Sequence, residues 1–372
     1  DKLVGFSGFG FPKAHAAAFG LLAYQSSWLR HYYPAEFLCA LLNAQPMGFY
    51  PPATLVRDAQ RHGVEVLPVD VNMSGARCAI EAVGANPESP SNSLLQATRF
   101  RPDTRRAPSN SLLQETSTAV RVGLSYISSL GIDDAQALVA EREAGGPYRD
   151  VADLARRSRL SCDALEALVK GGACDGFWKP RRDLLWELGL VFRAQSVPGS
   201  DGKEKQLPLE LEPTAETPAL RDLTRWERML ADYRHTSMSI ETHPLTLLRP
   251  HLPLGTLSSE ELHAERHGRQ VAFAGMTVAR QRPATAKGVV FMLLEDEHGQ
   301  VNLIVPSEVY DQHRAIVRAE PLVLARGRYE RVGENRNVLV SSLESLGTLA
   351  RRVAADDTVW ESLPRPHSFG RR

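Results

Sequence analysis

The sequence predicts a multidomain α+β protein in which helical domains precede a small β-barrel. Alanine- and leucine-rich helical patterns fill the first part of the chain, and glycine turns separate further helices in the middle. After position 268, apolar and polar residues alternate in the manner of β-strands. A chain of 372 residues also exceeds one ordinary hydrophobic core, so several domains are expected.

Residues 1–84 are expected to form the first helical domain. Residues 14–32 carry apolar side chains on nearly every face, which predicts a buried helix. Pro34 and Pro51 suit the first turns of two further helices. Residues 64–71 predict an edge strand or a bend, because Pro68 interrupts them.

The segment GFGFPKAH, residues 8–15, opens the first of these helices. A helix N-terminus presents free N–H groups and partial positive charge. Lys13 adds a full charge and His15 a hydrogen-bond donor, so the segment predicts a phosphate site. The plainer alternative is a glycine-flexed turn before a buried helix.

Residues 85–117 have a different composition from the rest of the chain. The string PSNSLLQ occurs at 90–96 and again at 108–114, around a basic stretch that contains proline. We expect a low-complexity duplicated insertion that forms a mobile loop. The functional alternative is a paired docking motif, or phosphate contact through the arginines of the basic stretch.

Residues 118–195 predict a helix-hairpin-helix region. Gly131 lies between apolar residues just before a helix, and Lys170, Gly171 and Gly172 follow another. Helix-hairpin-helix modules use such turns because glycine lets backbone N–H groups reach a DNA phosphate. Short glycine turns also join packed helices without binding anything, so both interpretations stay open.

The last part of the chain predicts an OB-fold between a linker and a tail. Residues 196–218 have a linker composition, and residues 219–267 are a mixed connecting segment. Residues 268–347 read as strand, strand, strand, helix, strand, strand, the order of a small Greek-key barrel that often binds oligonucleotides. Residues 348–372 are expected to be a flexible tail.

Basic residues of the barrel segment form two groups. Arg280, Arg282 and Lys287 cluster in the first loop, whereas Arg326 and Arg328 lie on a later strand. Such groups can bind the phosphates of single-stranded nucleic acid. We therefore expect these five residues to contact DNA.

Aromatic and acidic residues of the same segment admit two interpretations each. Phe273, Phe291 and Tyr329 can stack on bases or fill the barrel, and the continuous apolar run around Phe291 favours the barrel interior. The acidic run at 295–297 could bind a metal, but its position between two strands favours a solvated turn.

Composition excludes several classes of protein. Formal net charge is zero, so any phosphate binding depends on local clusters. The four cysteines lack CxxC spacing, which favours core residues in a reducing cytosol over zinc ligands. There is no membrane-length apolar run, secretory signal or familiar catalytic motif, so we expect no metal site and no catalytic residues in this chain. The first residue is not Met, and we expect a fragment of a longer protein.

Three segments together resemble the C-terminal part of bacterial C-family DNA polymerases, the DNA polymerase III α-subunit family. The stretch from GFGFPKAH to FYPP at 8–52 resembles the fingers, and VRVGLSYISSLG with LEALVKGGACD resembles the helix-hairpin-helix region. AGMTVARQRPATAKGVVFMLLEDEHGQVNLIVP resembles the OB domain. NAQPMGFY and RQRPATAKG are more similar to the error-prone branch than to the replicative one.

The resemblance implies roles for several residues. Lys13 and His15 would contact the incoming deoxynucleoside triphosphate, although Ala14 stands where many relatives have serine. The hairpins would grip duplex DNA, and the OB domain would meet single-stranded template. Phosphoryl transfer in the family needs Mg²⁺ held by palm carboxylates. Those carboxylates precede the fingers in the family, so we expect this chain alone to be inactive.

QLPLEL at 206–211 resembles the peptide that bacterial proteins insert into a sliding-clamp groove. Gln206 would be the polar anchor, and Leu207, Leu209 and Leu211 would fill an apolar pocket. An ordinary linker is the alternative.

We expect a fragment of a cytoplasmic, error-prone DNA polymerase that acts in translesion synthesis and DNA repair, with the clamp and other translesion proteins as partners. A replicative polymerase fragment and a non-catalytic OB-fold adaptor remain alternatives.

Overall fold

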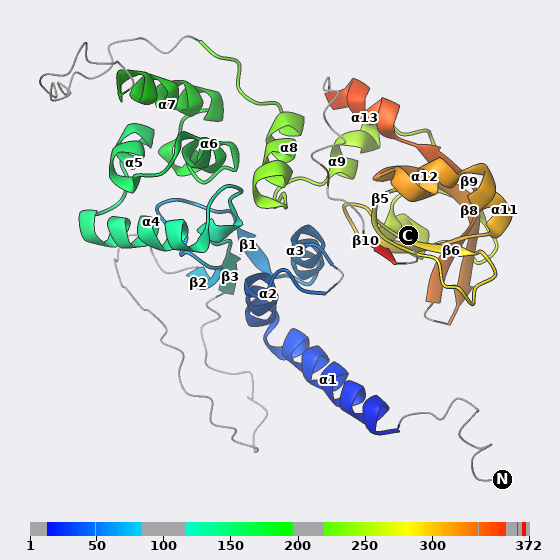
Figure 1. Ribbon diagram of the computed structural model, residues 1–372. Helices are drawn as coiled ribbons and strands as arrows, with labels where there is room; N and C mark the ends of the chain where they lie inside the picture. The colour runs from blue at the N-terminus through cyan, green and yellow to red at the C-terminus, as the bar shows by residue number, and fades with distance from the viewer. Residues whose placement is uncertain are drawn as a thin grey trace, which may run out of the picture.

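The computed structural model describes residues 13–48, 50–83, 117–195, 219–333, 335–354, 363 and 367–369 (Figure 1). The duplicated insertion and the QLPLEL peptide lie outside the described residues. The described part consists of helices, a small three-stranded sheet and a closed barrel, which confirms the predicted fold class. The predicted domain boundaries remain predictions.

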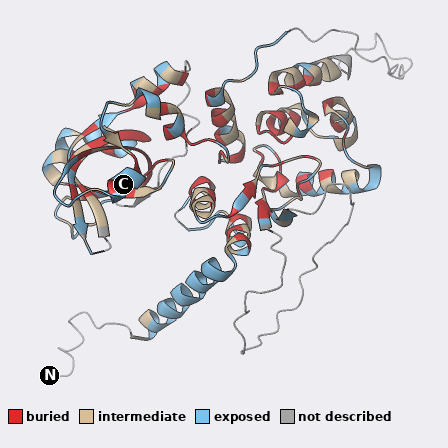
Figure 2. Ribbon diagram, turned by 180° about the vertical axis from the view of Figure 1, so that it is seen from behind, coloured by how far each residue is buried: buried red, intermediate tan, exposed pale blue. Residues whose placement is uncertain are grey.

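The first helices are α1 (Lys13–Tyr32), α2 (Pro34–Asn43) and α3 (Pro52–Arg61). The expected burial of α1 is wrong for this structure. The helix extends away from the body (Figure 1), and nearly all of its described residues are exposed (Figure 2). Phe19 and Tyr24, for example, are 58% and 68% exposed. The residues of α1 are apolar, but burial also requires a neighbouring surface, and among the described residues only those near the C-terminal end of α1 have one.

The small sheet joins the first helices to the hairpin region. Its strands β1 (Glu65–Leu67), β2 (Ala79–Val83) and β3 (Ser117–Arg121) lie in the order β1-β3-β2. β1 is therefore an edge strand that ends just before Pro68, which agrees with one of the two predicted alternatives. Gly123 follows β3 so closely against the backbone of Arg77 that a Cβ atom there would clash.

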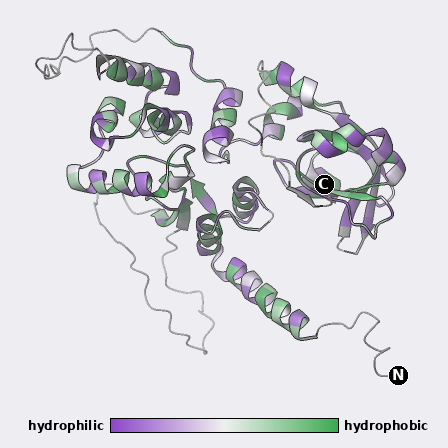
Figure 3. Ribbon diagram, in the orientation of Figure 1, coloured by the Kyte–Doolittle hydropathy of each residue, from purple (hydrophilic) through white to green (hydrophobic). Residues whose placement is uncertain are grey.

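Short capped helices build the hairpin region. They are η2 (Leu124–Tyr126), α4 (Ile132–Gly145), α5 (Val151–Ser158), α6 (Cys162–Lys170), η3 (Asp175–Phe177) and α7 (Arg181–Gln195). Asp150 and Ser161 cap α5 and α6 by accepting hydrogen bonds from backbone N–H groups. Hydrophobic and hydrophilic residues alternate along these helices (Figure 3), and the hydrophobic ones pack into a core that also includes residues of α2 and α8 (Arg225–Thr236).

The barrel closes through five strands in the order β5-β6-β7-β9-β8, with β8 pairing back to β5. Their bounds are β5 (Gln270–Gln281), β6 (Val290–Glu295), β7 (Gln300–Val305), β8 (Leu322–Val332) and β9 (Asn335–Ser345). The helices α11 (Ser307–Gln312) and α12 (Arg314–Ala319) lie between β7 and β8. The strand and helix order is the one predicted.

Peripheral elements attach the barrel to the helical body. They are α9 (Pro244–Leu248), η4 (Arg249–His251), β4 (Thr256–Leu257), α10 (Ser259–His263), α13 (Gly347–Ala354) and β10 (His367–Phe369). Ala274, Met276, Leu322 and Leu324 of the barrel belong to the same apolar core as the helical region. The barrel wall thus packs directly on the helices, while a second core fills the barrel itself.

Candidate nucleic-acid interface

A row of side chains crosses the outer surface of the barrel. Strand register places Gln281, Phe291, Ile304, Leu339 and Arg328 side by side on β5, β6, β7, β9 and β8. Their strand neighbours, such as Val290 and Met292, point into the core. The row is therefore the solvent face of the strands, with an apolar centre and polar ends.

Phe291 lies at the centre of this row and is 39% exposed. The expectation that Phe291 fills the barrel is wrong, because strand alternation turns it away from the interior. For Phe273 and Tyr329, where both interpretations were open, the structure decides for the barrel interior, because both are fully buried in its core. An exposed phenyl ring on an OB-type barrel offers a flat surface on which a base can stack.

The loop between β5 and β6 brings two exposed cations near this face. Arg282 lies with its guanidinium 4.4 Å from the ring centre of Tyr310, which orients it without neutralising it. Lys287 is also exposed. Contact between these two residues and DNA remains a prediction.

Arg280 differs from its two neighbours. It is 7% exposed and donates a hydrogen bond of 2.5 Å to the carbonyl oxygen of Glu320. Burial lowers the pKa of Arg280 to about 10. Its side chain therefore ties β5 to the end of α12, and a role in DNA contact stays a prediction that this placement does not favour.

The two arginines of β8 are paired with acids. Arg326 forms an ion pair with Glu344, and Arg328 pairs with Glu330 at 2.9 Å. Exposed pairs of this kind are weak, so DNA phosphates could replace the acids at small cost. Contact with DNA remains a prediction for both residues.

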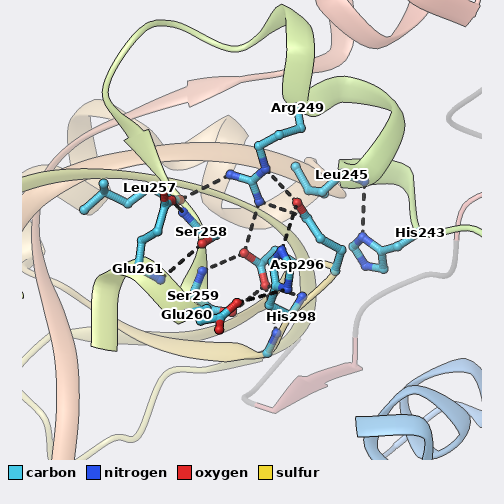
Figure 4. Close-up of polar contacts among 12 residues, drawn as sticks. His243, Leu245, Arg249, Leu257, Ser258, Ser259, Glu260, Glu261, Asp296 and His298 are labelled. Carbon is cyan, nitrogen blue, oxygen red and sulfur yellow. Dashed lines mark hydrogen bonds and ion pairs between the residues drawn. The ribbon is translucent and has the colours of Figure 1, made fainter. Parts of the chain in front are cut away.

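The acidic turn between β6 and β7 is not solvated, which corrects the sequence-based interpretation. Asp296 has no exposed surface and accepts hydrogen bonds from the backbone N–H and hydroxyl of Ser259, from the backbone of His298 and Gly299, and from Arg249 (Figure 4). Arg249 also holds Glu297, at 2.7 Å. The segment is a turn, as predicted, but its carboxylates anchor the barrel to η4 and α10.

We call the cluster of Asp296, Glu297, Arg249 and Ser259 the hub. Glu295 precedes it in the chain and, like Asp296, has no exposed surface. It accepts a hydrogen bond from Gln300 and lies 3.5 Å from Arg61 of α3. Burial raises its pKa, against the opposing effect of Arg61 and Arg57. The carboxylate therefore links the barrel to the first helical region.

His243 completes the contact between barrel and helices. Its Nδ1 accepts a hydrogen bond from the backbone N–H of Leu245 (Figure 4), so the proton of the neutral ring lies on Nε2, 3.9 Å from Glu295. Burial holds the pKa of His243 well below its usual value. The ring thus remains neutral, because burial and the nearby charges of Arg57, Arg61 and Arg249 all oppose its protonation.

The predicted hairpin glycines have structural explanations. A Cβ atom on Gly171 would lie 2.8 Å from Ile127, and one on Gly172, whose φ is +85°, would clash with Arg181. The N–H groups of both residues already donate to carbonyl oxygens of α6. Lys170 pairs with Glu166 at 2.5 Å. These glycines permit close packing, and their contact with DNA stays a prediction.

Gly131 caps α4 in the first hairpin. Its N–H donates to the carboxylate of Asp134, and Asp133 also lies in the first turn. Two exposed acids at this helix start oppose the approach of a phosphate. Contact between DNA and Gly131 therefore also remains untested.

Lys13 and His15 begin α1, far from the barrel (Figure 1). His15 is exposed, and its ring packs 4.4 Å from that of Phe19 one turn later. The side chain of Lys13 lies outside the described residues. Nucleotide contact is untested for both.

The described residues offer neither a metal-binding cluster nor a membrane-spanning helix. No group of three or more His, Cys, Asp or Glu side chains among them could hold a metal ion. None of the helices in the described ranges combines the length and apolarity needed to cross a membrane.

Known proteins match this chain over nearly its whole length. Residues 63–184 match the family model described as a helix-hairpin-helix motif. An error-prone DNA polymerase of Anaeromyxobacter dehalogenans is 41% identical over 93% of this chain and 28% of its own length. One from Burkholderia pseudomallei is 40% identical over 94% and 29%, and one from Rhizobium meliloti is 38% identical over 96% and 31%. The chain thus spans under a third of the length of these relatives, and over that part it is similar to bacterial error-prone DNA polymerases.

Proposed function

We propose that this chain is the DNA-binding part of an error-prone DNA polymerase, and that the outer face of its barrel holds single-stranded template. The exposed phenyl ring of Phe291 carries the proposal, because it stands at the centre of the barrel's solvent face. Arg282 and Lys287 lie in the adjoining loop and would meet the phosphates of the strand. The helix-hairpin-helix match supports DNA binding by the neighbouring region.

Fluorescence anisotropy with a labelled oligothymidylate tests the proposal on the 372-residue chain. Phe291→Ala is expected to weaken binding by about 1–3 kcal/mol, the usual contribution of one stacked base. Phe291→Tyr keeps a ring and should bind like the wild type. Leu254→Ala, at a fully exposed apolar residue outside the barrel face, is the control. Equal affinity of the Phe291→Ala and Leu254→Ala variants would remove Phe291 from the interface.

The proposal extends to the activity of a longer polymerase that contains this chain. Nucleotidyl transfer across damaged templates would require Mg²⁺, which supplies charge stabilisation for phosphoryl transfer. Asp296 and Glu295 do not fit Mg²⁺, because the oxygens of Asp296 are taken by five donors and Glu295 faces Arg61 and Gln300, and the described residues contain no cluster of three or more candidate ligands. Metal ligands would therefore come from outside the described residues, and this chain would bind and orient DNA.

Three further contacts belong to the same proposal. Lys13 and His15 would meet the incoming nucleotide, and the peptide at 206–211 would bind a sliding clamp and, with it, other translesion proteins. We also propose action in the bacterial cytoplasm, where template and nucleotides are present. Each of these steps rests on the sequence and on the similarity to error-prone polymerases.

A further inference from the structure

Trp178 is the most exposed aromatic side chain in the described part of the chain, at 92%. It follows η3, in the loop between α6 and α7. An indole is large and apolar, so exposing it to water is unfavourable for the free protein. Another tryptophan of the same region, Trp186 of α7, is only 43% exposed.

The backbone of Trp178 is unfavourable as well. Its φ is +59°, in the left-handed region that glycine adopts freely and bulky residues avoid. Glycine at this position would relieve the strain and remove the exposed ring. The exposed indole and the left-handed backbone of Trp178 therefore both lower the stability of the folded protein. Backbone strain of this kind is most common at functional positions.

A rigid support holds the loop in this form. Arg181 is 5% exposed and forms ion pairs with Asp175 at 2.7 Å and Asp232 at 2.8 Å. The N–H of Trp178 donates to the carbonyl oxygen of Asp175, at 3.1 Å. Asp175 thus connects the buried arginine to the strained residue.

Two glycines allow this support to pack. Gly172 lets Arg181 lie against the turn, since a Cβ atom would clash with its guanidinium. A Cβ atom on Gly176 would lie 2.6 Å from the carboxylate of Asp70. The indole is therefore presented from a fixed loop, and a partner would lose little affinity in ordering it.

We propose that Trp178 is a DNA-binding residue that stacks on an unpaired base where single-stranded template joins duplex. The inference rests on the proposed DNA-binding function but concerns a different site from the barrel face. The loop lies within the helix-hairpin-helix match, directly after the Gly171–Gly172 turn. A flat indole matches the face of any base, and stacking of this kind needs no base sequence.

The test uses the 372-residue chain and a primer–template oligonucleotide with a single-stranded overhang. Trp178→Gly should raise the thermal midpoint, because glycine suits the left-handed backbone, and should weaken binding roughly 5- to 100-fold. Trp178→Phe keeps a stacking ring, so its affinity should stay within about threefold of the wild type while most DNA-dependent quenching of tryptophan fluorescence disappears. Trp186→Ala is the matched control and should bind like the wild type.

The outcomes separate this inference from the proposed function. If Trp178→Gly binds the junction as tightly as the wild type, Trp178 is not a DNA contact, and a protein partner becomes the explanation to examine. That result would leave the effect of Phe291→Ala on oligothymidylate unchanged. If the wild type binds neither the oligothymidylate nor the primer–template, the proposed DNA-binding function is wrong, and the inference about Trp178 is wrong with it. Unchanged quenching in Trp178→Phe would also overturn the inference.

Discussion

Replacing Asp296 by alanine tests whether the acidic turn anchors the barrel. The side chain accepts five hydrogen bonds, one of them from Arg249, and is fully buried. The change leaves the buried N–H and hydroxyl of Ser259 without their acceptor. Arg249 keeps Glu297, but each buried donor left without an acceptor costs about 1–3 kcal/mol, so the two donors of Ser259 alone account for about 2–6 kcal/mol. This is a large share of the roughly 5–15 kcal/mol that stabilises an ordinary domain.

Hydrogen exchange of the β6 and β7 amides measures this loss locally, which avoids treating the whole chain as one cooperative unit. Asp296→Asn keeps one acceptor oxygen and should fall between the wild type and alanine. Glu260→Gln is the control: this acid lies on neighbouring α10, its side chain is 78% exposed, and its loss should change stability by less than about 0.5 kcal/mol. Equal protection in Asp296→Ala and Glu260→Gln would refute the anchoring role.

Three other predictions concern charge and partners. Arg282→Ala with Lys287→Ala should reduce the slope of log affinity against log salt for single-stranded DNA by about 0.7 per lost phosphate contact, whereas Arg280→Ala should lower barrel stability more than it changes this slope. Burial lowers the pKa of His235 to about 4, so between pH 6.5 and pH 4 only the unfolded chain binds this proton, and the free energy of unfolding decreases as the pH falls. Urea titrations should therefore show a smaller loss of stability over that range for His235→Asn than for the wild type. Gln206→Ala should abolish any clamp association seen by calorimetry, and its persistence would make the peptide an ordinary linker.

The order of elements could be predicted because it depends on local patterns. Period-two alternation defined β7, and the proline before α3 marked its first turn. Burial could not be predicted in the same way. The apolar helix α1 is exposed because no described element covers most of it, and the helix periodicity contains no information about neighbours.

The candidate site shows the same limit. Phe291 and Met292 are adjacent in one apolar run, yet one is 39% exposed and the other 1%. Strand alternation assigns them to opposite faces, but which face is solvent depends on how the barrel closes. The burial of Glu295 and Asp296 likewise depends on Arg61 and Arg249, which are distant in sequence. Only tertiary structure brings such partners to a turn that looked solvated.

The placement of these features on one strand connects anchoring to binding. β6 carries Phe291 near its start and Glu295 at its end, about 13 Å apart at the usual rise of a strand. The anchored end faces the helical body, through Arg61, whereas the other end presents the ring. A DNA that contacts both the barrel face and Trp178 would therefore gain from their fixed separation, as linked sites do. Loosening the hub with Asp296→Asn should weaken binding of a long primer–template more than binding of a short oligothymidylate that covers the barrel alone. Equal weakening of both would mean that the two sites act independently, and that the hub serves stability only.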